Sequence, residues 1–447
     1  DVLPAGVPDY YPMGGSSYGT EYTREQINEA LASDDPLSLV PTQDTIGHGT
    51  FLAGLAAGSS IPQEDFTGAA PEAELAVVKL KPAKKYLRDF YLIPSDAPAF
   101  QENDIMMGIK YLRMMADRLK KPLVILLAMG SNSGSHIGTS PLSQVTQNYS
   151  GFFGIITVIA CGNETGAAHH FYASIPAGTE YEDVEIRVGK EEAERGFVLE
   201  LWAADADTYT VGFISPSGER ISRIPIIANN ETSIPFLLDA TTITVNYQLI
   251  EAESGSQLIF MRFQTPAAGI WTVRVYNTQR FKGTFHMWLP VQGMISEETV
   301  FLRPDPYSTI TVPGNSRLPI TVGAYDTSTG GIYIHSSRGF TPNQIVKPEL
   351  AAPGVNILGP SVGRKPGSDT PMTTRTGTSA AAAITAGAAA NLLGWGIVEG
   401  NYPTMSEASV KSYLIRGAQR NPALTYPNRE FGYGTLDLFQ TFLRLRE

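Results

Sequence analysis

The stretch Gly377-Thr378-Ser379-Ala380-Ala381-Ala382-Ala383 opens a segment that carries no charged side chain until Glu399. Its richness in alanine and glycine predicts a helix that is buried on all sides. Ser379 would then stand at the amino end of this helix, where its Oγ points outward and its backbone N–H can stabilise an oxyanion. Ser379 is therefore a candidate nucleophile, and its alternative role is that of a helix cap.

Two other segments supply the groups that a serine nucleophile needs. Gly47-His48-Gly49-Thr50 precedes the small-residue run Phe51–Gly58, and Gly162-Asn163-Glu164 closes the apolar run Ile155–Cys161. A histidine can accept the serine proton, and an asparagine amide can donate a hydrogen bond to an oxyanion. We therefore predict His48, Asn163 and Ser379 as catalytic residues. The alternatives are a structural histidine at position 48 and a turn residue at position 163.

The order His, Asn, Ser resembles that of the subtilisin-like serine proteases, the subtilases. Gly68–Pro71 and the following Leu75–Lys79 resemble a turn and strand of that family. Ser336–Gly339 and Lys347–Val355 are similar to the segment that precedes its nucleophile, and Gly432–Asp437 to its closing segment. Because these matches keep their order along most of the chain, we expect a subtilisin-like fold.

Within the subtilases, Tyr18–Asn28 and a long β-rich insert resemble the Csp germination proteases of clostridial spores. The resemblance implies a serine endopeptidase that cleaves proteins through an acyl-enzyme and activates a zymogen in spore germination. It implies a protein or peptide substrate and the protein's own prodomain or an upstream segment as partners, no cofactor, and a spore-associated or secreted protein. It further implies a substrate-pairing strand formed by Ala128, Met129 and Gly130. By the same resemblance, one wall of the pocket for the P1 side chain is formed by Ala160, Cys161 and Gly162.

The sequence departs from the subtilase pattern at two places. Subtilases follow the serine with Met and then Ala-x-Pro, whereas this chain has Ala380–Ala383. These positions pack the helix and transfer no proton, so the change does not by itself threaten activity. The second departure concerns the triad aspartate, which the family places at the end of an apolar strand roughly 30 residues before the histidine.

No such strand precedes His48 in the sequence. Asp1 and Asp9 follow no apolar run, and Asp44 is too close to His48. We therefore expect the aspartate upstream of Asp1, in a strand that is cleaved, disordered or held in a separate piece. Two alternatives stay open: Asp1 is the aspartate, or the protein is an inactive pseudoprotease that acts as a binding or signalling module.

The rest of the first half predicts an α/β architecture. The pattern Thr23-x-x-Gln26 predicts a capped helix that ends near Ala32. Asp104–Leu119 reads as an amphipathic helix that leads into the apolar strand Leu123–Leu127. Fully apolar strands that alternate with helices predict a parallel sheet with helices on both faces.

The pattern changes between Glu180 and Val291. Short β-prone runs such as Phe197–Trp202, Thr241–Val245 and Trp271–Val275 are separated by turn clusters. We predict an inserted antiparallel β-sandwich, of jelly-roll type, that rigidifies the protease and contributes no catalytic group. The predicted domains are a first part of the subtilase domain at 1–180, the insert at 181–291, and the second part at 292–447.

Composition agrees with an enzyme that has a large core. The 447 residues are 43% hydrophobic and 17% charged, and the net charge of −11 comes without any basic run. We therefore expect neither nucleic acid nor an anionic membrane as a main partner. The segment Ala380–Val398 is nearly long enough to span a bilayer, but its alanine and glycine content favours a buried helix, so we expect no membrane span.

The remaining polar residues give no metal-site pattern. The single cysteine, Cys161, excludes an intramolecular disulfide and is expected to be a small buried hydrophobe. Asp205 and Asp207 could bind calcium, but a solvated turn is the preferred interpretation. Five histidines lack metal-ligand spacing and are expected to be surface or structural residues, so we predict no metal: His136, His169, His170, His286 and His335.

Overall fold

The computed structural model describes residues 19–204, 206–227, 230–363 and 371–445. It divides into two units, one made of residues 1–50 and 361–371 and the other of residues 51–360 and 372–447. In the first unit, α1 spans Arg24–Ala32 and α2 spans Pro36–Leu39. The predicted capping box is confirmed, because the Thr23 N–H donates to Gln26 Oε1 at 2.8 Å and the Gln26 N–H donates to Thr23 Oγ1 at 3.4 Å.

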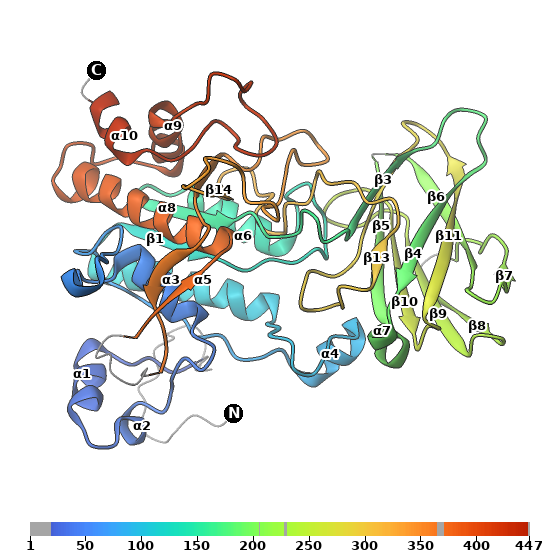
Figure 1. The fold of residues 1–447 in the computed structure, drawn as a ribbon, viewed down its shortest axis with the longest axis horizontal. Helices are drawn as coiled ribbons and strands as arrows, with labels where there is room; N and C mark the ends of the chain where they lie inside the picture. The colour runs from blue at the N-terminus through green and yellow to red at the C-terminus, as the bar shows by residue number, and fades with distance from the viewer. Residues whose placement is uncertain (1–18, 205, 228–229, 364–370, 446–447) are drawn as a thin grey trace. The chain divides into compact units, whose positions relative to one another are not determined.

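The second unit is built on a parallel sheet of four strands in the order β1-β2-β14-β15 (Figure 1). All six residues of β2 are buried, as expected for a parallel strand covered on both faces. The strands are β1 (Leu123–Leu127), β2 (Ile155–Ala160), β14 (Ile320–Tyr325) and β15 (Leu350–Pro353).

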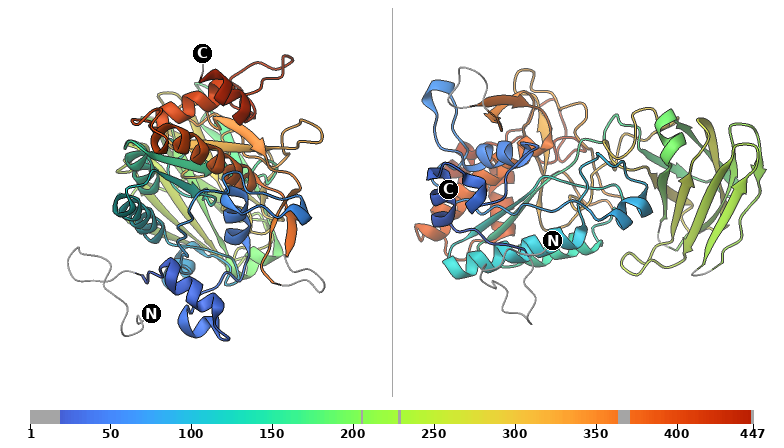
Figure 2. Two further views of the ribbon diagram at one scale, coloured as in Figure 1. Left: turned by 90° about the vertical axis from the view of Figure 1, so that its left-hand side faces the viewer. Right: turned by 90° about the horizontal axis from the view of Figure 1, so that it is seen from below.

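Helices cover both faces of this sheet, which confirms the predicted α/β arrangement (Figure 2). On one face, α5 (Glu102–Leu119) and α6 (Pro141–Ser150) pack Ile109 and Leu142 against strand residues such as Ile125. On the other face, α8 (Thr378–Leu393) and α9 (Glu407–Gly417) pack against strand residues of β2, β14 and β15.

Helix α8 is the core helix that the alanine-rich segment predicts. Twelve of its sixteen residues are buried, and a Cβ on Gly387 would lie 2.6 Å from the Ala56 carbonyl oxygen. Among the described residues, Thr378–Val398 is the one helical stretch long and apolar enough to cross a membrane, and 61% of its most apolar window is buried inside the protein. Its composition is therefore explained by packing in the core.

Two antiparallel sheets form the other part of the second unit, at the right of Figure 1. One has the order β3-β12-β5-β10-β9-β8 and the other β13-β4-β11-β6-β7, and they share one hydrophobic core that includes Trp271 and Phe263. The runs predicted as strands lie in β5, β9 and β11. The strands extend from His170 to Phe301, a wider range than the predicted 181–291: β3 (His170–Ser174), β4 (Tyr181–Val188), β5 (Phe197–Ala203), β6 (Thr208–Ile214), β7 (Arg220–Ile221), β8 (Glu231–Phe236), β9 (Thr241–Gln248), β10 (Leu258–Gln264), β11 (Gly269–Gln279), β12 (Thr284–Trp288) and β13 (Val300–Phe301).

One predicted strand is wrong. Leu75–Lys79 forms no strand, and its side chains Leu75 and Val77 are 55% and 71% exposed. Strand formation depends on pairing with a neighbour, which an apolar composition alone does not provide. The remaining elements are α3 (His48–Ala57), a 3₁₀ turn (Pro62–Glu64), α4 (Lys85–Tyr91), α7 (Lys190–Arg195), β16 (Ile357–Pro360), β17 (Met372–Arg375), a π-helical turn (Gly394–Val398) and α10 (Leu438–Arg444).

Candidate active site

Ser379 is the second residue of α8 and is half-buried. Its Oγ lies 3.5 Å from the Ala128 carbonyl oxygen, the first residue after β1. The amino end of α8 therefore meets the carboxyl end of the parallel sheet. At this end of a helix the backbone N–H groups are without helical acceptors and attract negative charge.

The Asn163 side chain is fixed at the same helix end. The Thr378 N–H and Thr378 Oγ1 both donate to Asn163 Oδ1, at 3.0 and 3.1 Å. Because the carboxamide oxygen is engaged in this way, the Nδ2 group is the donor that the side chain can offer to a ligand. Gly377, directly before α8, has φ 155°, a backbone conformation that favours glycine. The structure thus brings Asn163 and Ser379 together.

Thr311, which the sequence analysis missed, links the two predicted substrate-binding segments. A Cβ placed on Gly162 would lie 2.7 Å from Thr311 Cγ2, and a Cβ on Gly130 would collide with Thr311 Oγ1. The Thr311 N–H donates to the Cys161 carbonyl oxygen at 3.0 Å. Both glycines are therefore needed for this threonine to sit between them. Thr311 was not predicted because it lies 150 residues from Cys161 in the chain, and no sequence motif links the two.

The predicted substrate-pairing residues follow β1 directly. Met129 is 36% exposed, and Gly130 is exposed as well. Ser131 pairs with Val312 through two backbone hydrogen bonds of 3.0 and 2.8 Å, which continues the extended path of the chain. Ala160, in contrast, is 5% exposed and packs in the core under α8.

His48 belongs to the first unit, where it is the first residue of α3 and half-buried. The neighbouring Asp44 fixes this turn: its Oδ1 accepts the Gly47 N–H at 2.8 Å, and its Oδ2 accepts the Thr50 N–H at 3.0 Å. Burial raises the pKa of Asp44, but the hydrogen bonds from Gly47, Thr50 and Ile46 outweigh it and lower the pKa to about 2. The ionised carboxylate therefore caps the helix that His48 begins.

Cys161 has the expected role of a buried hydrophobe. Its side chain is fully buried, and burial raises the pKa of the thiol to about 12, although its hydrogen bonds with the Ser336 hydroxyl and the Ser337 backbone act against this. A thiol that stays protonated at neutral pH is a poor nucleophile. Cys161 is therefore not an alternative to Ser379 as the nucleophile.

The other polar residues are structural. No three His, Cys, Asp or Glu side chains of the described residues are placed to hold a metal ion. Asp205 lies outside the described residues. Asp207 is buried, which corrects the expectation of a solvated turn, and it accepts backbone N–H groups from Phe281 through Thr284. His136, His169 and His170 are buried, which excludes a surface role for them.

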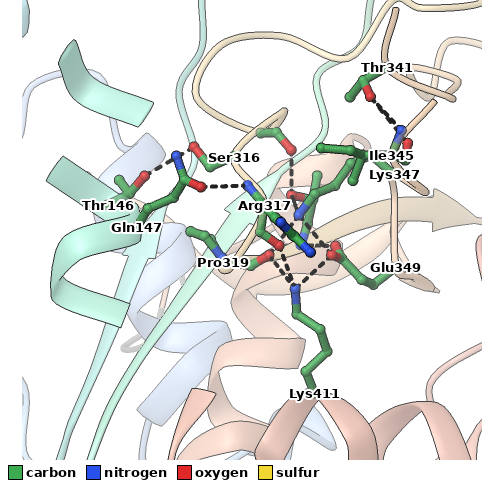
Figure 3. Close-up of polar contacts among 12 residues, drawn as sticks. Thr146, Gln147, Ser316, Arg317, Pro319, Thr341, Ile345, Lys347, Glu349 and Lys411 are labelled. Carbon is green, nitrogen blue, oxygen red and sulfur yellow. Dashed lines mark hydrogen bonds and ion pairs between the residues drawn. The ribbon is translucent and has the colours of Figure 1, made fainter. Parts of the chain in front are cut away.

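Buried charges gather at the opposite, amino end of the parallel strands (Figure 3). Glu349 Oε1 lies 2.7 Å from Lys347 Nζ and 2.8 Å from Lys411 Nζ, and Glu349 Oε2 accepts the Thr321 N–H at 2.8 Å. Burial lowers the pKa of Lys347 to about 8 against the pull of Glu349. These groups lie at the ends of the strands where no substrate-binding residue is predicted.

The comparisons with known proteins agree with this geometry. The subtilase family model matches residues 17–216 and 303–434. The CspB protease of Clostridium perfringens is 30% identical in sequence, with a TM-score of 0.84 over 95% of this chain and 85% of that chain. The prenylagaramide maturation protease PagA is 28% identical (TM-score 0.25; 30% of this chain, 45% of that chain), and the S41 psychrophilic protease is 15% identical (TM-score 0.44; 88% and 78%). The search of curated proteins found no match.

The fold, the helix-end serine, the family model and the similarity to CspB together define a subtilisin-like serine peptidase. The chain belongs to the subtilase family, and within it the structure stands close to a Csp protease. The family predicted from the ordered motifs is thus confirmed.

Proposed function

We propose that the protein is an endopeptidase that cleaves protein substrates through an acyl-enzyme on Ser379. His48 takes the proton of Ser379 Oγ, which attacks the carbonyl carbon of the scissile bond. Asn163 Nδ2 and the Ser379 N–H hold the oxyanion that forms. The observation that carries this proposal is the pair of hydrogen bonds from Thr378 to Asn163 Oδ1, because they fix an amide donor beside the serine.

The second half of the reaction uses the same groups. His48 returns the proton to the leaving amine, and the acyl-enzyme is then hydrolysed by a water molecule that His48 deprotonates. The substrate backbone pairs with Ala128, Met129 and Gly130 as an added β-strand. Ala160, Cys161 and Gly162 form a wall of the P1 pocket.

The P1 pocket is expected to accept small side chains. Thr311 occupies the space between Gly130 and Gly162, where a Cβ on either glycine would meet its side chain. A large P1 side chain entering between these segments would need the same space. We therefore expect alanine or another small residue at P1 to be preferred over phenylalanine. The substitution Thr311→Gly should allow larger P1 side chains to be accepted.

A strand that carries the triad aspartate would pair with Leu75–Lys79. This segment has the apolar, β-prone sequence of a strand, yet its Leu75 and Val77 side chains are exposed. A strand added here, from the prodomain or from an upstream segment, would cover them. Its aspartate would hold the tautomer of His48, a contribution of about 10⁴-fold in turnover.

We propose that the protein activates a zymogen in spore germination, in a spore-associated or secreted setting. The proposal is supported by its similarity to CspB, which is called a protease. The insert is proposed to be a jelly-roll sandwich at 181–291, between the subtilase parts 1–180 and 292–447. It would stiffen the protease and supply no catalytic group.

The test is hydrolysis of fluorogenic peptides that differ only at P1, by the protein together with any segment that precedes Asp1. We expect turnover with alanine at P1, a burst of product equal to the enzyme concentration for an activated ester, and neither with Ser379→Ala. A folded wild-type protein without turnover or burst would favour the alternative, a pseudoprotease that binds or signals.

A further inference from the structure

Glu164, the residue after Asn163, is a buried carboxylate with an unusual set of partners. Its side chain is 5% exposed. Glu164 Oε2 lies 3.1 Å from His169 Nδ1, directly before β3, and Glu164 Oε1 accepts the Gln292 N–H at 3.2 Å. His169 stands directly before β3, and Gln292 stands in the connection between β12 and β13. One carboxylate therefore holds the chain where it enters the antiparallel sheets and where it leaves β12.

The same carboxylate reaches the substrate-binding segment through Asn132. Asn132 Nδ2 donates to Glu164 Oε2 at 3.4 Å and to the Leu289 carbonyl oxygen at 3.0 Å. The Asn132 carbonyl oxygen is 3.0 Å from His136 Nε2, and the ring of His136 stacks on Trp288 at 3.8 Å between centroids. The segment that follows Gly130 thus contacts the end of β12 through Asn132 and His136.

The backbone at Glu164 is fixed as well. The Glu164 N–H donates to Ser337 Oγ at 3.0 Å, and the Ser337 N–H donates to the Gly162 carbonyl oxygen at 2.9 Å. Asn163 therefore lies between Gly162 and Glu164, whose backbones both form hydrogen bonds with Ser337. An oxyanion donor must be placed within about 0.5 Å to act fully, so the rigidity of this turn bears on catalysis.

We propose that Glu164 is a positioning residue, through which the insert sets the geometry of the oxyanion donor Asn163. This inference rests on the proposed function of Asn163. Its physical basis is that a buried carboxylate needs all of its donors. Two of its three donor partners, His169 and Gln292, come from the segments that directly precede β3 and follow β12, so the position of the turn that carries Asn163 depends on the docking of these segments.

The test uses Glu164→Gln, which keeps the size of the side chain but turns an amide N–H₂ toward groups that donate. We expect kcat to fall roughly 10-fold with little change in KM, a smaller loss than the roughly 10²–10³-fold for removal of an oxyanion donor itself. The matched control is Glu192→Gln. Glu192 is fully buried in the insert and accepts from Ser296 and Thr299, so this control should lower the melting temperature and leave kcat unchanged.

A double-mutant cycle separates positioning from general weakening. If Glu164 acts through Asn163, then Glu164→Gln should have no further effect on kcat in the Asn163→Ala background. An equal loss in both backgrounds, or an unchanged kcat in the folded single variant, would overturn the proposal.

Hydrogen exchange tests the inference independently of activity. Backbone amides of the peptide covering residues 161–166 should exchange faster in Glu164→Gln than in wild type or in Glu192→Gln. Unchanged exchange would contradict the positioning role. Faster exchange in a protein that hydrolyses no peptide would uphold the positioning role and reject only the proposed endopeptidase function.

Discussion

The two ends of the parallel sheet each hold a buried carboxylate, but its partners differ. At the amino end, Glu349 is paired with Lys347 and Lys411, and all three belong to the protease fold itself. At the carboxyl end, Glu164 contacts His169, directly before β3, and Gln292, between β12 and β13. The amino end of the sheet is therefore stabilised by charged residues of the protease fold, whereas the end with the proposed active site depends on contacts with a distant segment of the chain.

The amino end also shows why these charges are there. Strand β15 begins opposite Val322, one residue after Thr321, and the Thr321 N–H donates to Glu349 Oε2 instead of to a strand. Likewise β14 begins opposite Val158, and the Thr157 N–H donates to Glu407 Oε2 at 2.6 Å. Carboxyl groups thus satisfy backbone donors at the staggered strand ends.

The largest effect should come from Ser379→Ala, which removes the nucleophile. We expect kcat to fall by up to about 10⁶-fold. Stability should hardly change, because the only hydrogen bond of the Ser379 hydroxyl among the described residues is a long one of 3.5 Å to Ala128. Peptide hydrolysis and a melting curve on the same sample check both parts. A large drop in melting temperature would mean that this end of the sheet is structural as well.

Asn163→Ala should have the next largest effect on activity, a loss of roughly 10²–10³-fold in kcat. The matched control is Asn391→Ala in α8, which loses a hydrogen bond of 2.8 Å from Asn391 Nδ2 to the Ala69 carbonyl oxygen. The control should lower stability by about 1 kcal/mol and keep its kcat. Equal kinetic losses in the two variants would remove the distinction between a catalytic and a structural amide.

Glu349→Ala probes the amino end. It leaves the fully buried Lys347 without its carboxylate, and breaking such a pair typically costs about 3–5 kcal/mol in the free energy of unfolding. The fraction that stays folded should retain the wild-type kcat, as measured by urea unfolding and by activity corrected for the folded fraction. A changed kcat in that fraction would show that the two ends are coupled.

The smallest effect should be the pH dependence of Glu407→Gln. Burial raises the pKa of Glu407 to about 8, so the folded state keeps this proton while the unfolded state releases it above its ordinary pKa. The group therefore costs stability progressively as pH rises from about 4.5 to 8. Glutamine does not titrate, so the stability of the variant should gain on that of the wild type progressively over this range. A constant difference between pH 5 and 8 would contradict the assignment.

Composition located two strands of the parallel sheet but not β14. The run Leu123–Leu127 coincides with β1, and the apolar run Ile155–Cys161 contains β2, because a strand buried on both faces is apolar throughout. Leu75–Lys79 has a similar composition but forms no strand, because strand pairing is a non-local property that composition does not contain.

The proposed site was predictable where motifs carry it and hidden where the fold creates it. Ser379 and Asn163 stand in short motifs with glycine neighbours, and the structure places them at one helix end. Glu164 and Gln292 are 128 residues apart in the chain, so only the return of the insert brings them together. Their contact left no pattern in the sequence.

The central claim is that the carboxyl end of the sheet carries a serine nucleophile at the start of α8. Its most direct test is to treat the folded protein, with any segment that precedes Asp1, with a fluorophosphonate and to locate the adduct by mass spectrometry of its peptides. The account predicts a single adduct on Ser379 in wild type and none in Ser379→Ala. A folded wild-type protein that takes no adduct, or that carries it on another residue, would contradict it.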